Sequence, residues 1–314
     1  MRNIAFLFLC EAFSRTGSIV VLSSMALIGR ELAPHAALAT LPLALAPVTT
    51  MLVTVPAARL MQRRGRKVGF VLGAVLGMVG GLVGCAALFN EHFALLCVGA
   101  VGIGAVNGFS TYYRFAAAEV VDESRRSRAI SLVMAGGIVA AVAGSNLASW
   151  SRGLFPEHLF AGSYLAIAGI QVLVLCALSF VCFPAPSVAE SAGGGRSLRE
   201  IARDARFVIA LVGAVASWAV MSLLMNATPL SMHRHMHSFD DTAWVIQWHV
   251  LGMFVPSFFT GHLISRFGEG RIMASGLLLL ALSVFTNLGG VDLHNYAVGL
   301  ALLGVGWNLL FVGA

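Results

Sequence analysis

The sequence carries very little charge for its length. Only 11% of its 314 residues are Asp, Glu, Lys or Arg, whereas a soluble domain needs roughly a quarter to cover its surface. Hydrophobic residues make up 58% of the chain, and the mean hydropathy is +0.87. We infer that lipid, and not water, is the main solvent of this protein. The formal net charge of +6 lies in short turns between apolar runs, which indicates membrane topology and not nucleic-acid binding.

Motifs for nucleotide hydrolysis and for common hydrolase chemistry are also absent. There is no G-x-x-x-x-G-K-[ST] loop, so the chain has no ATP-binding loop of its own. Neither G-x-S-x-G nor H-E-x-x-H occurs, which argues against membrane hydrolases and proteases. The five cysteines lie in apolar runs and form no C-x-x-C pair, so we expect neither disulfides nor a cysteine metal site. No enzyme activity and no cofactor are predicted.

Three histidines, His233, His235 and His237, alternate in one polar turn. On an extended strand this spacing would align three imidazoles, as a zinc site requires. Apart from Asp240 and Asp241, no carboxylate or cysteine lies close by in the sequence. A solvated loop is the preferred interpretation, and no metal is expected.

Long apolar runs dominate the rest of the chain. A helix needs about 20 apolar residues to cross roughly 30 Å of hydrocarbon, and ten runs come near this length. The runs are continuous and not alternating, which favours helices over a β-barrel. The predicted spans are Ile4–Ile28, Ala37–Leu60, Val68–Phe89, Phe93–Ala117, Ala129–Trp150, Leu159–Phe183, Phe207–Leu230, Ala243–Ile264, Ile272–Gly290 and Tyr296–Val312. The first run has no A-x-A-like cleavage site, so we expect it to be a span and not a signal peptide.

One long polar stretch, residues 184–206, divides the spans into six and four. Its prolines and the triplet Gly193–Gly195 argue against an early helix, whereas Ser197–Glu200 could start one along the membrane surface. We predict an N-terminal six-helix bundle (residues 1–183), a central cytoplasmic loop (184–206) and a C-terminal bundle of four helices (207–314). A twelve-helix plan would need two more spans, so either the sequence is a fragment or two helices are absent.

Basic residues are distributed unevenly among the turns. If residue 1 is cytoplasmic, fifteen of them fall in inside turns, and only Arg30, Arg152 and Arg234 fall in outside turns. The positive-inside rule therefore predicts a cytoplasmic N-terminus.

The turn after the second span contains four clustered cations. Residues 58–67 read A-R-L-M-Q-R-R-G-R-K, and residues 261–268, after the eighth span, read G-H-L-I-S-R-F-G. The first segment resembles the signature G-x-L-x-D-R-x-G-R-K of the major facilitator superfamily (MFS). The matching residues are Leu60, Arg63, Gly65, Arg66 and Lys67. Gln62 stands where the family has aspartate, and the second copy has Ser265 there.

This resemblance implies an all-α membrane protein with an MFS-type helical bundle, about ten helices of a twelve-helix (6+6) plan being present. It implies a bacterial inner-membrane transporter that moves a small organic solute by alternating access. Transport coupled to protons and facilitated diffusion without protons are both open. The chain could also be a truncated, non-transporting paralogue or, more remotely, an intramembrane metalloenzyme. We expect a monomer. Some bacterial members carry riboflavin, and a planar, polar compound such as a vitamin would suit the tyrosine, tryptophan and amide groups in the spans.

In this family the loop is thought to clamp the two halves together. On the resemblance we assign gating to Arg63, Gly65, Arg66, Lys67, Asp122, Arg126, Arg266 and Gly268. Gln62 cannot form the family's ion pair, so the clamp should be weaker here. The alternative is that these cations only anchor the loop at anionic headgroups, which favour each basic residue by about 1 kcal/mol.

Ionisable residues inside the spans are the candidate transport residues. Glu11 and Arg15 are one helical turn apart and share a face. A charge at the centre of a helix costs about 2.5–3.5 kcal/mol even on the lenient insertion scale, so we expect this pair to bind substrate or carry a proton. Glu11 near the interface is the alternative. The same pathway is predicted to include Asn107, Tyr113, Arg114, Asn226, Trp307 and Asn308. Snorkelling of Arg114 and simple helix–helix hydrogen bonding by the amides are their alternatives.

Overall fold

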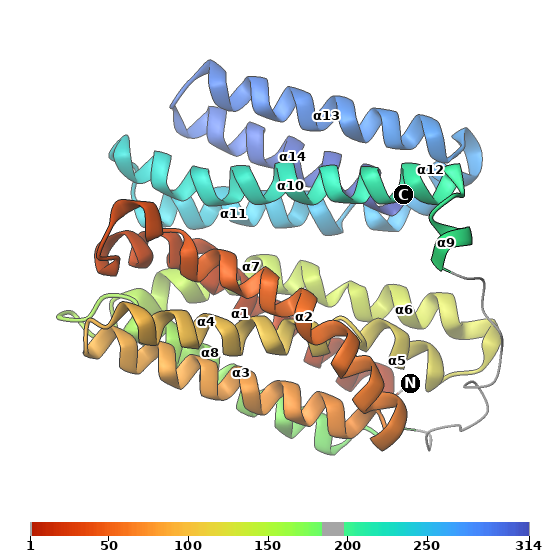
Figure 1. Ribbon diagram of the computed structural model, residues 1–314, viewed down its shortest axis with the longest axis horizontal. Coiled ribbons are helices and arrows are strands. Elements are labelled where there is room, and N and C mark those ends of the chain that lie inside the picture. The colour runs from red at the N-terminus through yellow and green to blue at the C-terminus, as the bar shows by residue number, and fades with distance from the viewer. Residues whose placement is uncertain (1, 184–197, 314) are drawn as a thin grey trace. The chain divides into compact units, whose positions relative to one another are not determined.

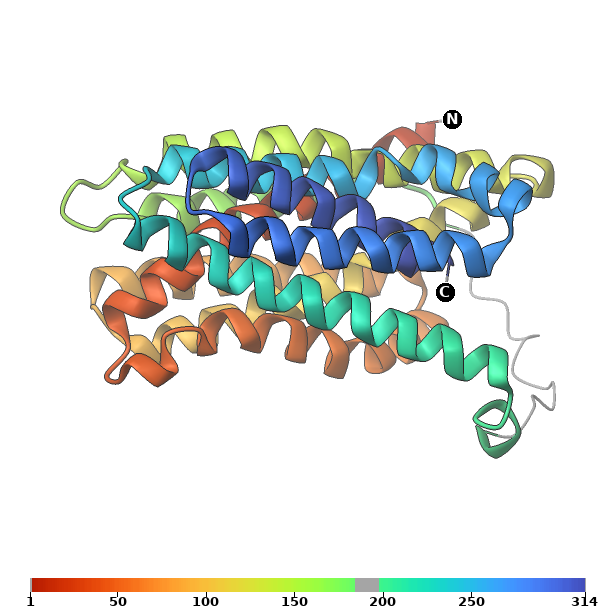
Figure 2. The same cartoon turned by 90° about the horizontal axis from the view of Figure 1, so that it is seen from above.

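A computed structural model describes residues 2–183 and 198–313. The chain folds into two compact units, residues 1–186 (unit 1) and 187–314 (unit 2). Within each unit long helices run side by side (Figures 1 and 2). The described residues contain no β-strand, so the prediction of an all-helical chain is confirmed. A bilayer demands this, because every backbone N–H and C=O must be paired within the chain.

Unit 1 is built around its first helix, which contacts the helices α2, α4, α5, α6, α7 and α8. The helices are α1 (Arg2–Leu32), α2 (Leu41–Arg64), α3 (Arg66–Phe89), α4 (Phe93–Ser110), α5 (Tyr113–Glu119), α6 (Arg126–Met134), α7 (Gly136–Arg152) and α8 (Ala161–Ser179), with short 3-10 turns at Ala36–Leu38 and Glu123–Arg125. One apolar core at one end of the unit includes Leu7 of α1, Phe70 of α3, Tyr113 of α5 and Val174 of α8.

Glycines bring α3 and α4 into direct backbone contact. A Cβ placed on Gly102 would lie 2.6 Å from the Cα of Gly80, and one on Gly80 would lie 2.9 Å from the Gly99 carbonyl oxygen. Neither helix could carry side chains here without moving apart. Small residues at such crossings are the usual way in which membrane helices gain packing contacts.

Unit 2 is organised around its last helix, α14 (Leu293–Gly313), which contacts α10, α11, α12 and α13. The other helices are α9 (Leu198–Ile201), α10 (Ala205–Arg234), α11 (Phe239–Phe254), α12 (Ser257–Phe267) and α13 (Glu269–Gly289). Of the predicted central loop, residues 184–197 lie outside the described residues. The short α9 begins within the predicted Ser197–Glu200 segment.

Nine helical segments in the described part of the chain are long and apolar enough to cross a bilayer. They correspond to nine of the ten predicted spans. The predicted span Ala243–Ile264 is instead divided between α11 and α12 at Pro256, whose ring removes a backbone donor and bends the helix. Val255 and Pro256 keep right-handed helical angles, so the division is a kink and not a loop.

The side chain of Asn308 on α14 forms hydrogen bonds with residues on both sides of this kink. Its Nδ2 donates to the Met253 carbonyl at 2.8 Å and lies 2.6 Å from the Ser257 hydroxyl oxygen, while its Oδ1 accepts from the Thr260 hydroxyl at 2.6 Å. The side chain is 1% exposed. The amide therefore supplies α11 and α12 with polar partners at the point where proline interrupts the helical ladder.

The two glycines of the repeated loop motif adopt the same backbone conformation. Gly65 has φ 90° and ψ 156°, and Gly268 has φ 86° and ψ 151°. Each ends one helix by donating its N–H to the carbonyl four residues earlier, Met61 at 2.9 Å and Ile264 at 2.8 Å, and each begins the next helix. This conformation is open almost only to glycine. The equivalent geometry supports a chain built from two related halves.

Candidate functional site

The predicted charge pair forms on one face of α1. Arg15 Nε donates to Glu11 Oε1 at 2.8 Å, with Glu11 2% exposed and the Arg15 side chain 33% exposed. The helix places the two residues together because they are separated by about one turn. The carboxylate is therefore enclosed, whereas the guanidinium is still partly open to a ligand.

A second cation approaches the same pair. Arg114, in the first turn of α5, lies within electrostatic range of both Glu11 and Arg15. Its guanidinium lies 4.8 Å from the ring centre of Phe115, and its buried Nε has no hydrogen-bond partner among the described residues. Two arginines and one carboxylate thus lie in this region of unit 1, which leaves an excess of positive charge and an unpaired N–H on Arg114. The contact between Glu11 and Arg15 is formed, and a common binding site that includes Arg114 stays a prediction.

The side-chain amide of Asn107 on α4 contacts α1 on the face that carries Glu11 and Arg15. Ser18, about one turn beyond Arg15, donates to Asn107 Oδ1 at 2.8 Å, and this bond leaves the Nδ2 hydrogens of Asn107 available. The hydroxyl of Ser18 also lies 3.2 Å from the Ser14 carbonyl. Ser18 was not predicted; a hydroxyl on the same helical face as Glu11 and Arg15 was the signal that could have revealed it.

Tyr113, the neighbour of Arg114, is part of the apolar core of unit 1. It is 1% exposed, and its ring lies 4.5 Å from that of Phe70 in the apolar core. These contacts show that it packs helices α3 and α5 together. Its role in a substrate pathway stays a prediction.

The predicted pathway residues of unit 2 are spread over two helices. Asn226 of α10 donates to the Ser222 carbonyl at 2.7 Å, and its Oδ1 is buried without a partner among the described residues. Trp307 of α14 is 9% exposed and stacks on Phe311 with the ring centres 4.7 Å apart. The side-chain amide of Asn308 already makes hydrogen bonds at the Pro256 kink. Of these residues, Asn226 and Trp307 retain unused polar atoms.

The basic loop after α2 binds to other elements of unit 1. Arg66 makes two parallel bonds to Glu119 at the end of α5, Nε to Oε2 at 3.0 Å and Nη2 to Oε1 at 2.5 Å. Lys67 Nζ donates to the Ser179 carbonyl at 3.2 Å, at the C-terminus of α8. The loop therefore joins α3 to α5 and α8. The sequence did not reveal Glu119 because the family motif pointed to the more distal Asp122.

The other predicted gating residues are exposed except for Gly65, which is half-buried. Arg63 lies on the surface, Arg126 is 3.9 Å from Glu123, and Arg266 lies over the Phe267 ring at 5.4 Å.

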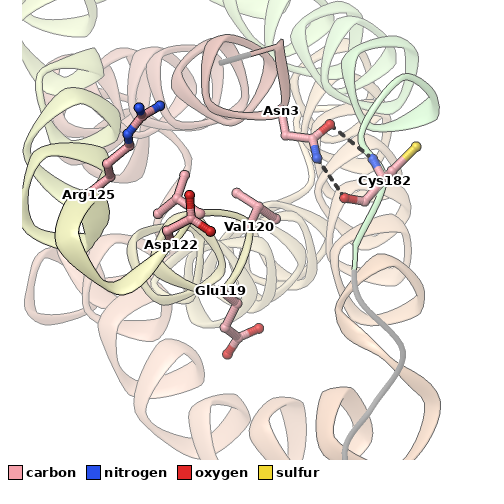
Figure 3. A pocket seen from close by; sticks show the side chains of 7 residues that line it. Asn3, Glu119, Val120, Asp122, Arg125 and Cys182 are labelled. Carbon is pink, nitrogen blue, oxygen red and sulfur yellow. Dashed lines mark hydrogen bonds between the residues drawn. The ribbon is translucent and has the colours of Figure 1, made fainter.

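An open cavity of about 490 Å³ lies at the end of unit 1 that holds Asp122. Figure 3 shows Asn3 beside it, bound to the backbone of Cys182 through both amide atoms. The lining residues are Asn3, Glu119, Val120, Val121, Asp122, Arg125 and Cys182. The Glu11 site does not line this cavity.

Reversing either charge of the Arg66–Glu119 pair is expected to destabilise unit 1. The variants Arg66→Glu and Glu119→Arg each replace an attraction by a repulsion, with an expected loss of about 1 kcal/mol because the pair is only partly buried. The swapped double variant should regain most of that loss. The melting temperature of the purified protein in detergent measures the effect.

The Arg126–Glu123 pair is the matched control, since it is longer and its side chains are 56% and 91% exposed. Reversing its charges should leave the melting temperature unchanged. Equal effects at both pairs would contradict a specific role for the bidentate contact.

The histidine turn does not form the extended strand that a zinc site would need. His233 lies in the last turn of α10, and His235 Nδ1 is 2.8 Å from the Ser231 carbonyl. His237 Nε2 is 2.8 Å from the Val291 carbonyl. In the part of the chain that the structure describes, no group of three His, Cys, Asp or Glu side chains is placed to hold a metal ion. The metalloenzyme alternative therefore loses the geometry on which it rested.

Comparison with known sequences places this arrangement in a family. The family model described as Major Facilitator Superfamily matches residues 4–314. The riboflavin transporter RfnT of Brucella anthropi is 40% identical over 317 residues, covering 100% of this chain and 79% of that protein. The uncharacterized MFS-type transporters YddS and YdeG of Bacillus subtilis are each 28% identical, covering 98% of this chain and 74% and 75% of their own lengths.

Solved structures agree with this assignment. Two crystal structures of FucP, one in the outward conformation and one of a variant of the E. coli fucose:proton symporter, superpose with a TM-score of 0.63. They are 19% and 18% identical and cover 100% of this chain and 85% of theirs, which establishes the fold alone. The relatives are transporters and not enzymes, and the apolar helices make this a multi-pass membrane protein. The chain belongs to the Major Facilitator Superfamily of transporters.

Proposed function

We propose that this protein transports riboflavin across the bacterial inner membrane by alternating access. The observation that carries the proposal is the 40% identity with a riboflavin transporter over 100% of this chain. A planar, polar vitamin is also the class of solute that suits the amide and aromatic groups in the spans. The N-terminus lies in the cytoplasm, as the distribution of basic residues indicates, and the protein acts as a monomer.

The chemistry of riboflavin matches the donors on unit 1. Its isoalloxazine ring is planar and neutral, with carbonyl oxygens along one edge, and its side chain carries hydroxyl groups. The guanidinium groups of Arg15 and Arg114 offer N–H donors to the hydroxyl oxygens of that side chain, and so does the amide of Asn107. A site that hydrogen-bonds these groups discriminates strongly against solutes that lack them, because its buried donors would otherwise be left unpaired.

Glu11 is the residue that couples transport to protons in this proposal. While ionised, it holds Arg15 through the 2.8 Å bond. Protonation removes its negative charge, so that Arg15 is released toward substrate, and a deprotonation step restores the pair. The Arg63–Lys67 loop, with Asp122, Arg126, Arg266 and Gly268, acts in gating. Facilitated diffusion without a proton is the alternative mechanism.

Uptake into proteoliposomes tests the proposal. The full chain is reconstituted, and entry of radiolabelled riboflavin is followed with and without an imposed pH gradient. Saturable uptake that the gradient accelerates is the expected result, and empty liposomes give the background. Saturable uptake that the gradient does not change would favour facilitated diffusion. Absence of riboflavin uptake by folded protein would overturn the substrate assignment and leave a non-transporting paralogue as the better hypothesis.

A further inference from the structure

Three aromatic rings meet between two helices of unit 2. Trp307 and Phe311, one turn apart on α14, stack with their ring centres 4.7 Å apart and an interplanar angle of 16°. Trp218 of α10 lies perpendicular to both, 5.4 Å from Trp307 and 6.1 Å from Phe311. The helices α10 and α14 lie side by side (Figure 1), so the three residues of the cluster all belong to unit 2.

The depth of Trp218 is unusual for a tryptophan of a membrane helix. It lies near the middle of the 30-residue α10, about 20 Å from the nearer end at 1.5 Å per residue. Tryptophans that anchor a protein in the bilayer gather instead at the two interfaces. Trp218 is also 45% exposed. An exposed indole at this depth is therefore not explained by an interfacial belt.

Trp307 carries a polar group that the fold leaves unused. Its side chain is 9% exposed, and its indole N–H has no hydrogen-bond partner among the described residues. Buried tryptophans usually pair this N–H, and a buried donor without an acceptor is destabilising. A ligand oxygen would complete the hydrogen bonding of this group.

We propose that Trp218, Trp307 and Phe311 form a subsite for the planar ring of the transported solute. The ring stacks on the exposed indole of Trp218, and reorientation of that side chain brings a ring carbonyl to the Trp307 N–H. The hydroxylated chain of the solute makes no contact with this subsite. The assignment rests on the proposed transport of riboflavin, and it predicts that lumichrome, the same tricyclic ring without the ribityl chain, competes for it.

Two substitutions separate stacking from packing. Trp218→Leu removes the ring but keeps an apolar side chain. It should raise the KM for riboflavin uptake roughly tenfold, as removal of an aromatic side chain that stacks on a nucleic-acid base does in other proteins. It should also weaken inhibition by lumichrome to a similar extent. Trp218→Phe retains a ring and should restore most of the affinity. Trp307→Phe removes only the N–H and part of the ring, and the KM should rise severalfold with the melting temperature little changed.

Trp248→Leu is the matched control, because Trp248 of α11 is also 45% exposed and contacts another tryptophan, Trp244. Its KM should equal that of the unmodified protein. Unchanged KM values for Trp218→Leu and Trp307→Phe, in protein that transports riboflavin, would overturn the subsite but not the proposed function. Failure of the unmodified protein to transport riboflavin would instead overturn the function, and the subsite with it.

Fluorescence tests the subsite without relying on a leucine variant that folds poorly. Bound flavin quenches nearby tryptophan emission, so riboflavin should quench the detergent-purified protein. Trp218→Phe should reduce the quenched fraction more than Trp248→Phe does. An equal reduction by the two variants would contradict a flavin ring seated at Trp218.

Discussion

Replacing Glu11 by glutamine is expected to lower the rate of riboflavin uptake on the order of tenfold or more and to remove its dependence on a pH gradient. Glu11 is almost fully buried, and its carboxylate is paired with Arg15 through the 2.8 Å bond. Glutamine keeps the shape and one hydrogen-bond acceptor but cannot take up or release a proton. Removing the carboxylate also leaves Arg15 without its partner, and the loss of stability is smaller than for a fully buried pair because the Arg15 side chain is 33% exposed. Initial rates in proteoliposomes over a range of imposed gradients measure both effects.

Two variants show whether the effect belongs to the charge pair. Glu31→Gln changes an exposed acid at the far end of the same helix and should leave uptake unchanged. The double variant Glu11→Gln with Arg15→Gln removes both charges together, so it should recover folded protein but not pH-dependent transport. Normal rates and a normal gradient response in Glu11→Gln would eliminate Glu11 as the coupling residue.

Alanine at Gly65 or Gly268 is expected to destabilise the protein by about 1–3 kcal/mol at each position, because both residues have a backbone conformation that is strained for any residue with a Cβ. At Gly268 a Cβ would meet no atom within 4 Å, so the loss there comes from the backbone alone. The double variant should lose about the sum, since the two glycines serve separate helix junctions. Melting temperature and the yield of monodisperse protein in detergent measure this loss.

Gly270→Ala is the matched control. Gly270 lies two residues further along, inside α13, where a Cβ also meets nothing within 4 Å and the backbone is helical. Alanine is the better helix former, so this variant should be as stable as the unmodified protein or slightly more stable. Equal losses at Gly268 and Gly270 would mean that the positive φ is not what the loop motif requires.

The helices could be predicted well because their cause is local. A run of apolar side chains can be solvated only by lipid or by other helices, and the backbone must then pair with itself, so length and hydropathy are sufficient. The prediction of the spans was less accurate where a single proline bends a helix. Pro256 divides a single apolar run into α11 and α12, and hydropathy does not detect such a kink.

The candidate site was predictable only in part. Glu11 and Arg15 could be paired because the helical repeat places them together. Arg114 and Asn107 were found as unusual polar residues in spans, but their approach to α1 depends on how α4 and α5 pack against it. Glu119 was missed because the family motif pointed to Asp122, and its bond to Arg66 joins helices that are far apart in sequence.

By itself the sequence determined the solvent of this protein, the approximate spans, the family and the glycines at the two loops, since each follows from composition, run length or a short motif. The tertiary structure decided which polar groups are already occupied and which are left for a solute. Trp307 and Asn308 are neighbours in sequence. The side-chain amide of Asn308 makes its hydrogen bonds at the Pro256 kink, whereas the indole N–H of Trp307 has no partner among the described residues. Hydrogen bonding depends on atoms brought within about 3 Å by packing, and no pattern along a single chain specifies that distance.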